Sequence, residues 1–197
     1  MLVAIEGVNG CGKTTLINDI TEQLKRMGKR VKVYKFPDRN GKAGKLIDDF
    51  LQKKKQFKYK YDMFDAFAKN RAHVLAQISR DLNRNIIVIC DRYIASGMAY
   101  HIPHDVSDAV LNNYFKILGH FDKDMIVPHK TYLIDGYHLH KRNEAKQIFH
   151  HDFVQARYVF ETFKRIIPKC TVEHMIVPNR DGRSSVAASC IIHDIIS

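Results

Sequence analysis

The sequence lacks any apolar run approaching the ~20 residues that a membrane-spanning helix requires. It enters strand-like sequence directly after its first residue, without a recognisable signal peptide. It has few cysteines, and Cys11, Cys90, Cys170 and Cys190 show no C-x-x-C spacing, which argues against a zinc site and a disulfide framework. These absences predict a cytosolic protein with reduced thiols.

The sequence also lacks internal repeats, low-complexity linkers and any sign of a domain boundary. Its 197 residues, 45% of them hydrophobic, are enough for one full core, so we expect a single domain over residues 1–197. The formal net charge of +11 suits either nucleic acid or small polyanions such as nucleotides. Much of the excess lies in a lysine cluster that fits a solvated helix end and loop equally well: Lys53, Lys54, Lys55, Lys58 and Lys60. Composition alone leaves the partner open.

One local pattern is far more specific. From Gly7 to Thr14 the chain reads G-V-N-G-C-G-K-T, which fits the phosphate-binding pattern G-x-x-x-x-G-K-[ST]. An apolar run precedes it and an amphipathic stretch follows, so backbone N–H groups of the loop and a helix N-terminus are expected to face one anion. We expect Lys13 to reach the terminal phosphates of a nucleoside triphosphate and Thr14 to ligate Mg²⁺. The expected phosphate-binding residues are Gly7, Asn9, Gly10, Cys11, Gly12, Lys13, Thr14 and Thr15.

Strand-like and helical stretches alternate along the whole chain. Unbroken or alternating apolar runs predict strands, and apolar residues spaced by three and four predict helices. Strands are expected at 2–5, 31–36, 86–90, 131–134 and 172–177, and helices at 16–24, 46–51, 61–82, 94–100, 106–118, 153–167 and 186–196. This order predicts an α/β fold, a doubly wound parallel sheet flanked by helices, whose ligands bind at the carboxyl ends of the strands.

Two charged residues follow the strand at 86–90. Asp91 and Arg92 are expected to emerge beside the phosphate loop, where an Asp can hold Mg²⁺ or its waters and an Arg can brace a phosphoryl group. Motor-type ATPases usually carry a second acidic residue at the position of Arg92, and the N-K-x-D signature of GTPases does not occur here. These features favour a kinase.

Four stretches together resemble the thymidylate (dTMP) kinases, a family of P-loop nucleoside monophosphate kinases. They are Glu6-Gly7 with the phosphate loop, Phe36-Pro37-Asp38-Arg39, Phe67-Ala68-Lys69-Asn70-Arg71, and Asp91-Arg92-Tyr93 continuing to Ser96-Gly97 and Tyr100. Their order and spacing match the family from about residue 1 to about residue 105, and the likeness is loose beyond that. The resemblance implies Mg²⁺-assisted, ATP-dependent phosphorylation of dTMP to dTDP by a cytoplasmic homodimer.

The resemblance also implies a role for each matching residue. Phe67 would stack the pyrimidine, although periodicity alone makes it equally an ordinary core residue, and Arg71, one turn on, would donate to a ring carbonyl. Arg39 and Arg92 would clamp the acceptor phosphate, and Tyr100 would lie under the sugar and disfavour a 2′-hydroxyl. The implied dTMP-binding set is Asn9, Phe36, Arg39, Phe67, Arg71, Arg92, Ser96 and Tyr100, with Ser96 at the base edge. The implied metal ligands are Thr14 and Asp91, and the implied catalytic residues Lys13, Arg92 and Arg142.

The chain departs from the family pattern at two places. Asn9 stands where many members carry an acidic residue that holds the 3′-hydroxyl, so we expect a looser sugar or base preference. The phosphate loop contains no arginine, and members of that kind supply the cation from a mobile lid. The lid candidate is the segment at about 136–150. Within it we favour Arg142 over Lys141 and Lys146, because a planar guanidinium can bridge two phosphates.

Two other functions stay open from the sequence. A deoxynucleoside kinase would need a carboxylate base, and Glu6 lies next to the phosphate loop. A nucleic-acid-stimulated ATPase would use the net charge of +11, although Arg92 argues against it. A zinc site is not expected, because no Cys or carboxylate accompanies the paired histidines at ligand spacing. These histidines are His138, His140, His150 and His151.

Overall fold

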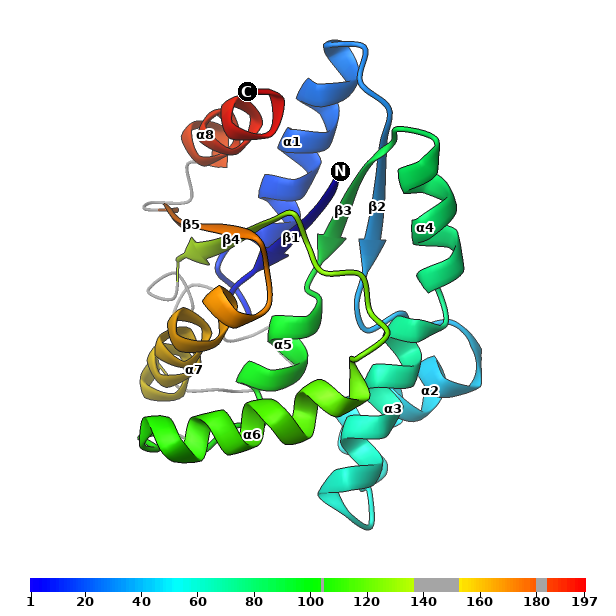
Figure 1. The fold of residues 1–197 in the computed structure, drawn as a ribbon, viewed down its shortest axis with the longest axis vertical. Coiled ribbons are helices and arrows are strands. Elements are labelled where there is room, and N and C mark those ends of the chain that lie inside the picture. Colours follow the sequence, from blue (N-terminus) through cyan, green and yellow to red (C-terminus); the bar gives the residue numbers. More distant parts are fainter. Residues whose placement is uncertain (104, 137–152, 180–183) are drawn as a thin grey trace.

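The computed structural model describes residues 1–103, 105–136, 153–179 and 184–197. Within these residues, five parallel strands form one sheet in the order β2-β3-β1-β4-β5. The strands are β1 (Leu2–Glu6), β2 (Val31–Lys35), β3 (Ile87–Asp91), β4 (Lys130–Asp135) and β5 (Glu173–Pro178). Helices flank the sheet, so the expected parallel α/β fold is confirmed (Figure 1).

The order of the strands places β1 in the middle of the sheet. All five of its residues are buried, and Ile5 is in register with Asp91 of β3 on one side and with Tyr132 of β4 on the other. The chain leaves β1 toward β2 on one side, and later crosses from β3 to β4 on the other side. The loop after β1 therefore lies at the switch point of a doubly wound sheet, where ligands of such folds bind.

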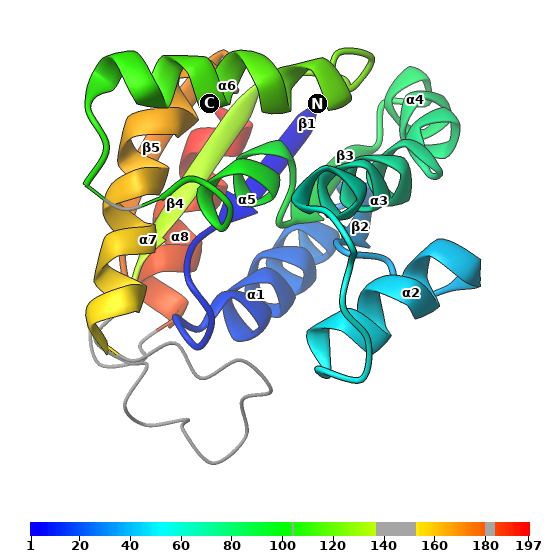
Figure 2. The ribbon, with the colours of Figure 1, turned by 90° about the horizontal axis from the view of Figure 1, so that it is seen from below.

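The helices cover both faces of the sheet. They are α1 (Lys13–Arg26), α2 (Gly41–Leu51), α3 (Lys60–Ala72), α4 (Leu75–Asn83), α5 (Ile94–Ala99), α6 (Asp108–Phe121), α7 (Phe153–Ile166) and α8 (Ser184–Ile196), with a 3-10 turn η2 (Ile167–Lys169). Helices α1 and α8 lie side by side on one face, and α4, α5 and α7 on the other (Figure 2). Helices α3 and α6 lie at the end of the molecule to which the strands point, whereas both termini lie at the opposite end (Figure 1).

The predicted single helix over residues 61–82 is wrong. The structure has two helices there, α3 and α4, separated at His73 and Val74. Helix α3 packs toward α6, where Phe64 contacts Phe121, whereas α4 packs on the sheet and buries Ile78 completely. Apolar residues at helical spacing continue through the junction, because those of α3 face α6 and those of α4 face the sheet. Spacing alone does not show where one packing surface ends and the next begins.

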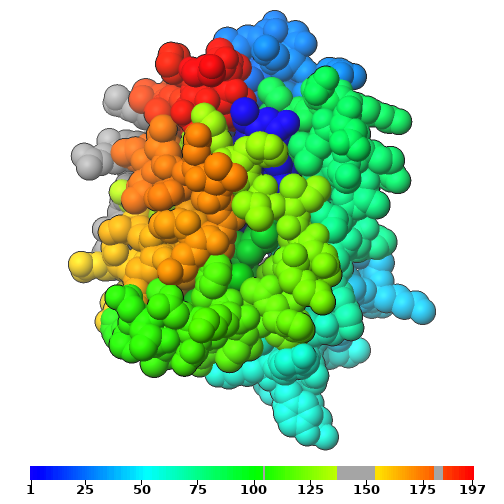
Figure 3. All heavy atoms as spheres, in the orientation of Figure 1, coloured from blue at the N-terminus to red at the C-terminus, as the bar shows by residue number. Residues whose placement is uncertain are grey.

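The lysine cluster lies on a projecting part of the surface. The α2–α3 connection, coloured cyan to light blue, extends from the body in the space-filling view (Figure 3), and all five lysines are exposed. Lys55 lies 3.9 Å from Asp49, and Lys58 lies over the ring of Tyr59, 5.2 Å from its centroid. The exposure agrees with a solvated helix end and loop.

Two further observations bear on the expected class of protein. All four cysteines are unpaired, and Cys190 is the exposed one. Within the described ranges, no helix is both long and apolar enough to cross a membrane.

Candidate active site

The phosphate loop connects β1 to α1 in a conformation that requires glycine. Gly7, Gly10 and Gly12 have φ values of 145°, 76° and 90°, which side chains rarely adopt. A Cβ on Gly7 would lie 3.1 Å from the carbonyl oxygen of Ile134, and one on Gly12 would lie 2.5 Å from Nδ2 of Asn179. Helix α1 has no side-chain cap and no acidic residue in its first turn. Its N-terminal N–H groups and dipole are therefore suited to an anion.

The ammonium group of Lys13, the first residue of α1, is held by this loop. Its buried Nζ donates to the carbonyl oxygens of Gly7 at 2.9 Å and Val8 at 2.6 Å, and lies 3.5 Å from Sγ of Cys11. Burial lowers the pKa of Lys13, and the nearby charge of Arg92 acts in the same direction. The ammonium is held by carbonyl dipoles rather than by a bonded carboxylate. Its charge thus remains available to a phosphate group.

Arg92 joins the phosphate loop to helix α5. It has a left-handed backbone with φ of 67°, a conformation that costs about 1–3 kcal/mol for a non-glycine residue and is concentrated at functional sites. Its guanidinium donates to the carbonyl of Gly7 at 2.8 Å, to Oγ of Ser96 at 3.2 Å and to Oδ1 of Asn9. It also lies over the ring of Tyr100, 5.2 Å from the centroid. The structure brings these predicted site residues together around one guanidinium.

Glu6 is buried and fully bonded. Its carboxylate accepts from the backbone N–H groups of Tyr93 at 2.9 Å and Ser96 at 3.1 Å, and from the Ser96 hydroxyl. Burial raises the pKa of Glu6, and these hydrogen bonds oppose the rise. The carboxylate thus ties β1 to the first turn of α5, a role that the sequence did not reveal. The same contact engages the Ser96 hydroxyl, whose assignment to the base edge stays a prediction.

The residues expected to form the acceptor half of the site lie on α3 and α5, and α3 also contacts α6. Phe67 is partly exposed, whereas Arg71 is buried in a bidentate ion pair with Asp122. Arg71 donates from Nε to Oδ1 at 2.9 Å, and from Nη2 to Oδ1 at 2.8 Å and to Oδ2 at 2.7 Å. A Cβ on Gly97 of α5 would lie only 2.7 Å from Nη1 of Arg71, so glycine makes room for the guanidinium.

Two of the recognised stretches are joined by a residue to which the sequence gave no role. The side chain of Asn70 accepts from the backbone N–H of Asp38 at 2.8 Å and donates to its carbonyl at 2.7 Å. Next to this junction, Arg39 forms an ion pair with Asp48 of α2. Phe36 is buried and contacts the ring of Tyr93, with 5.7 Å between centroids. The roles of Arg39 and Phe36 in binding dTMP stay predictions.

Two further residues support the loop from strands that follow it in sequence. The buried side chain of Asn179 donates to the carbonyl of Cys11 at 2.8 Å. A Cβ on Gly136 would lie 2.7 Å from the same oxygen. Gly136 directly follows β4 and Asn179 directly follows β5. Position at the carboxyl end of a strand was the signal that could have identified both.

The expected metal ligands come from α1 and from the end of β3. Thr14 is exposed in the first turn of α1, and Asp91 is buried at the end of β3. The Asp91 carboxylate has Lys35 at 3.7 Å. A hydroxyl and a carboxylate suit Mg²⁺, which usually binds through one or two protein oxygens together with phosphates and water. Among the described residues, no group of three His, Cys, Asp or Glu side chains forms a metal site by itself.

Some predicted residues lie outside the described part of the chain. Arg142, Lys141 and Lys146 are among them, as is most of the expected lid. The histidines at 138, 140, 150 and 151 lie outside it as well. Their assignments stay predictions.

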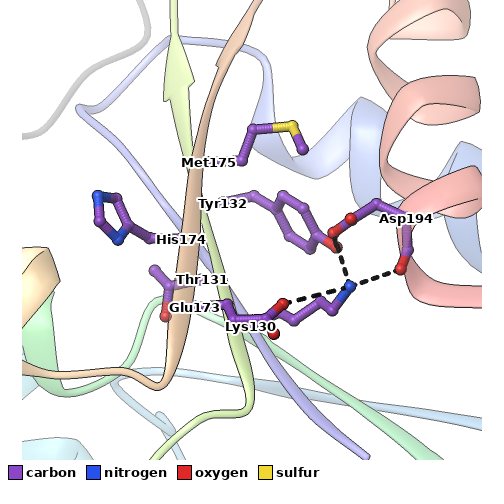
Figure 4. A pocket seen from close by; sticks show the side chains of 7 residues that line it. All are labelled: Lys130, Thr131, Tyr132, Glu173, His174, Met175 and Asp194. Carbon is purple, nitrogen blue, oxygen red and sulfur yellow. Dashed lines mark hydrogen bonds and ion pairs between the residues drawn. The ribbon is translucent and has the colours of Figure 1, made fainter. Parts of the chain in front are cut away.

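A small cavity of about 60 Å³ lies at the other edge of the sheet (Figure 4). It is lined by Lys130, Thr131, Tyr132, Glu173, His174, Met175 and Asp194. Lys130 and Glu173 are the first residues of β4 and β5, so the cavity lies at the amino ends of the strands. It is therefore remote from the phosphate loop.

Comparisons with known proteins identify the family that the chain resembles in sequence and fold. The family model described as thymidylate kinase matches residues 5–179. Thymidylate kinase of Danio rerio is 31% identical over 99 residues, and that of Homo sapiens 32% identical over 99 residues; each match covers 50% of this chain and 46% of the relative. The chain thus spans about half the length of the curated relatives that it matches. A solved structure of thymidylate kinase from Candida albicans has a TM-score of 0.77 at 26% identity, covering 98% of this chain and 90% of that chain.

Proposed function

Because the chain belongs to the thymidylate kinase family, we propose that it transfers the γ-phosphoryl group of ATP to dTMP, giving dTDP and ADP. One observation carries the proposal. Arg92 contacts Gly7 of the phosphate loop on one side and the ring of Tyr100 on the other. A donor phosphate on the loop and an acceptor phosphate next to α5 would therefore share one cation.

The charges of the site suit phosphoryl transfer without a general base. An oxygen of the acceptor monophosphate is already nucleophilic, so positioning and charge neutralisation carry the reaction. Lys13 and Arg92 supply positive charge, and neither donates a hydrogen bond to a carboxylate of the described residues. Mg²⁺ held with ATP by Thr14 and Asp91 would neutralise further charge on the phosphates.

The two alternatives gain no support from the described residues. A deoxynucleoside kinase needs a carboxylate that reaches a neutral hydroxyl, whereas Glu6 is 0% exposed and bonded to Tyr93 and Ser96. A nucleic-acid-stimulated ATPase was suggested by charge alone, and the lysine cluster is an exposed projection. The family to which the chain belongs instead favours a nucleoside monophosphate kinase.

We propose a cytoplasmic homodimer that associates through α6. Val110 and Ile117 are 41% and 56% exposed, and they lie two turns apart on one face of that helix. Phe121, one turn beyond Ile117, forms an aromatic pair with the exposed Tyr61 of α3, with 4.8 Å between ring centroids. Exposed apolar residues gathered on one face are typical of protein interfaces. Sedimentation of the wild type and of Ile117→Asp tests this, since a homodimer should become monomeric.

The activity is tested by measuring ADP release with ATP and each common nucleoside monophosphate and nucleoside. We expect dTMP to give the highest kcat/KM and thymidine to give no turnover. Preference for nucleosides over monophosphates would overturn the proposal in favour of a nucleoside kinase. Stimulation by DNA without any monophosphate would favour the ATPase.

A further inference from the structure

The side chain of His101 lies in the acceptor half of the site, although no motif pointed to it. It comes directly after Tyr100, which ends α5. Its ring packs edge-on against Phe64, with 4.7 Å between centroids, and against Phe67, with 5.8 Å. His101 therefore contacts the aromatic ring that the resemblance assigns to the base. A pyrimidine stacked on Phe67 would have the imidazole as a neighbour.

The hydrogen bonding of His101 fixes which nitrogen carries the proton. Nδ1 lies 2.6 Å from the carbonyl oxygen of Gly97, and a carbonyl only accepts, so Nδ1 is the donor. Burial lowers the pKa of His101 to about 4, and the nearby charges of Arg71 and Lys60 act in the same direction. The ring is thus neutral at pH 7, and Nε2 carries a lone pair. Among the described residues, Nε2 has no hydrogen-bond partner.

Gly97 brings this acceptor next to a donor. Its carbonyl holds His101, and its Cα faces the guanidinium of Arg71, where a Cβ would lie 2.7 Å from Nη1. Asp122 engages Nε and Nη2 of Arg71, which leaves Nη1 as the arginine's open donor within the described structure. A fixed donor and a fixed acceptor therefore lie on two sides of one glycine.

The other acceptors near this place are already engaged. The Asp122 carboxylate is held by Arg71. The Ser96 hydroxyl donates to Glu6 and accepts from Arg92. Of these three side-chain acceptors, Nε2 of His101 is the one that no other described residue engages.

We propose that His101 and Arg71 together read the edge of the acceptor base, Nε2 of His101 accepting from a ring N–H while Nη1 of Arg71 donates to the adjacent carbonyl. This inference rests on the proposed function and names its specificity-determining residue. Thymine and uracil carry a carbonyl next to a ring N–H, and guanine carries the same pair. Cytosine presents the reverse pattern, an amino group next to a bare nitrogen, so it would place donor against donor and acceptor against acceptor.

The competing explanation is that His101 only fills space between Phe64 and Phe67 and holds the Gly97 carbonyl. Two variants separate these roles. His101→Phe keeps an aromatic ring and loses both nitrogens. His101→Asn keeps a short amide that can donate to Gly97 but does not extend to the position of Nε2. His101→Gln is the rescue variant, because its longer side chain can place an amide oxygen near that position.

The test compares kcat/KM for dTMP with that for its N3-methyl analogue, in which the ring N–H is replaced by N–CH₃ and both carbonyls are kept. In the wild type, we expect dTMP to be preferred by roughly 5- to 30-fold, the effect of one unpaired polar group in a buried contact. His101→Phe and His101→Asn should remove that preference, mainly by raising KM for dTMP, and His101→Gln should restore part of it. The ratio of dTMP to dCMP turnover should fall in the same two variants.

The outcomes distinguish the inference from the proposed function. A wild type that uses dTMP but shows the same preference in both variants overturns the inference alone. Equal losses with dTMP and the N3-methyl analogue overturn it too, in favour of a packing role. A wild type that ignores dTMP overturns the proposed function and the inference with it. If His101→Phe does not fold, His101→Asn against His101→Gln decides by the same comparison.

Discussion

The amino and carboxyl edges of the sheet, where the parallel strands begin and end, hold their cations in opposite ways. At the amino edge, Lys130 lies 3.1 Å from Asp194 and 3.5 Å from Glu173 (Figure 4). At the carboxyl edge, Lys13 donates to two backbone carbonyls and Arg92 donates to a carbonyl and two neutral side chains. A carboxylate cancels the charge of a cation, whereas a carbonyl only orients it.

The difference shows how one sheet separates stability from function. In a parallel sheet the helix that follows each strand points its N-terminus at the carboxyl edge, which adds positive potential there. Lys13 and Arg92, which donate to no carboxylate in the described part of the chain, add to that potential, so this edge is suited to polyphosphates. The paired charges at the amino edge instead attach α8 to the strands, because Asp194 belongs to α8 and Lys130 to β4.

The largest expected effect comes from removing a cation at the carboxyl edge. Lys13→Ala should lower kcat for dTMP phosphorylation by at least about 10³-fold, because charge that develops on the transferred phosphoryl group loses a fixed partner. Lys130→Ala is the matched control at the other edge and should keep near-normal turnover. Steady-state kinetics with circular dichroism on both variants checks the prediction. Equal losses of kcat in Lys13→Ala and Lys130→Ala would contradict the functional difference between the carboxyl and amino edges.

A second change concerns Arg71, which differs from Lys13 and Arg92 because its buried guanidinium forms an ion pair with the carboxylate of Asp122. Asp122→Ala leaves the guanidinium buried without a countercharge, which typically costs about 3 kcal/mol or more. We expect the free energy of unfolding in urea to fall by about that amount, and less in Asp122→Asn, which keeps an acceptor oxygen. An unchanged stability would mean that Arg71 reaches water when its partner is removed.

A third change tests whether the acceptor half is independent of the donor half. Phe67→Ala should raise KM for dTMP by roughly 5- to 150-fold, the equivalent of about 1–3 kcal/mol of lost base stacking. KM for ATP should change little, because the ring of Phe67 packs against His101 on the acceptor side of the site. Titrating both substrates in one coupled assay provides the comparison. Equal changes in both KM values would show that Phe67 is structural.

The same contrast explains what the sequence could predict. The phosphate loop and Asp91-Arg92 were identified because each is a short contiguous motif whose geometry follows from a strand and its next turn. The ion pair of Arg71 with Asp122 joins residues 51 positions apart, and no pattern links them. Whether Glu6 faced a ligand or the N–H groups of α5 depended in the same way on packing between distant elements.

The prediction of one helix over residues 61–82 was wrong for a related reason, because contacts between distant elements decide where the helix breaks. Residues of α3 and α4 satisfy one periodic pattern, yet they pack against α6 and against the sheet respectively. Tertiary contacts thus decided the break that local spacing could not. The sequence did not identify His101 as a site residue, because a lone histidine after a helix matches no motif. Its proposed role follows from its contacts with Phe67 and Gly97.

The smallest expected effect is at the amino edge and depends on pH. The Tyr132 hydroxyl donates to the Asp194 carboxylate, and this bond, together with Lys130, holds the pKa of Asp194 below its ordinary value of 3.8. A carboxylate whose pKa is lower in the folded than in the unfolded state adds stability above the unfolded pKa. That contribution is lost as the pH falls through the folded pKa, here below about pH 4. Asp194→Asn should remove the contribution at every pH.

The expected size is modest because the pair is partly exposed, with 17% of the Lys130 side chain and 31% of the Asp194 side chain accessible. Such pairs contribute up to about 1 kcal/mol. Urea unfolding at pH 7 should therefore show Asp194→Asn less stable than the wild type by that amount or less, and the gap should narrow toward pH 3. Turnover of dTMP at pH 7 should be unchanged, because the charge lost lies at the edge remote from the phosphate loop. A variant that unfolds normally but loses activity would show that the amino edge contributes to function and would break the separation between the two edges.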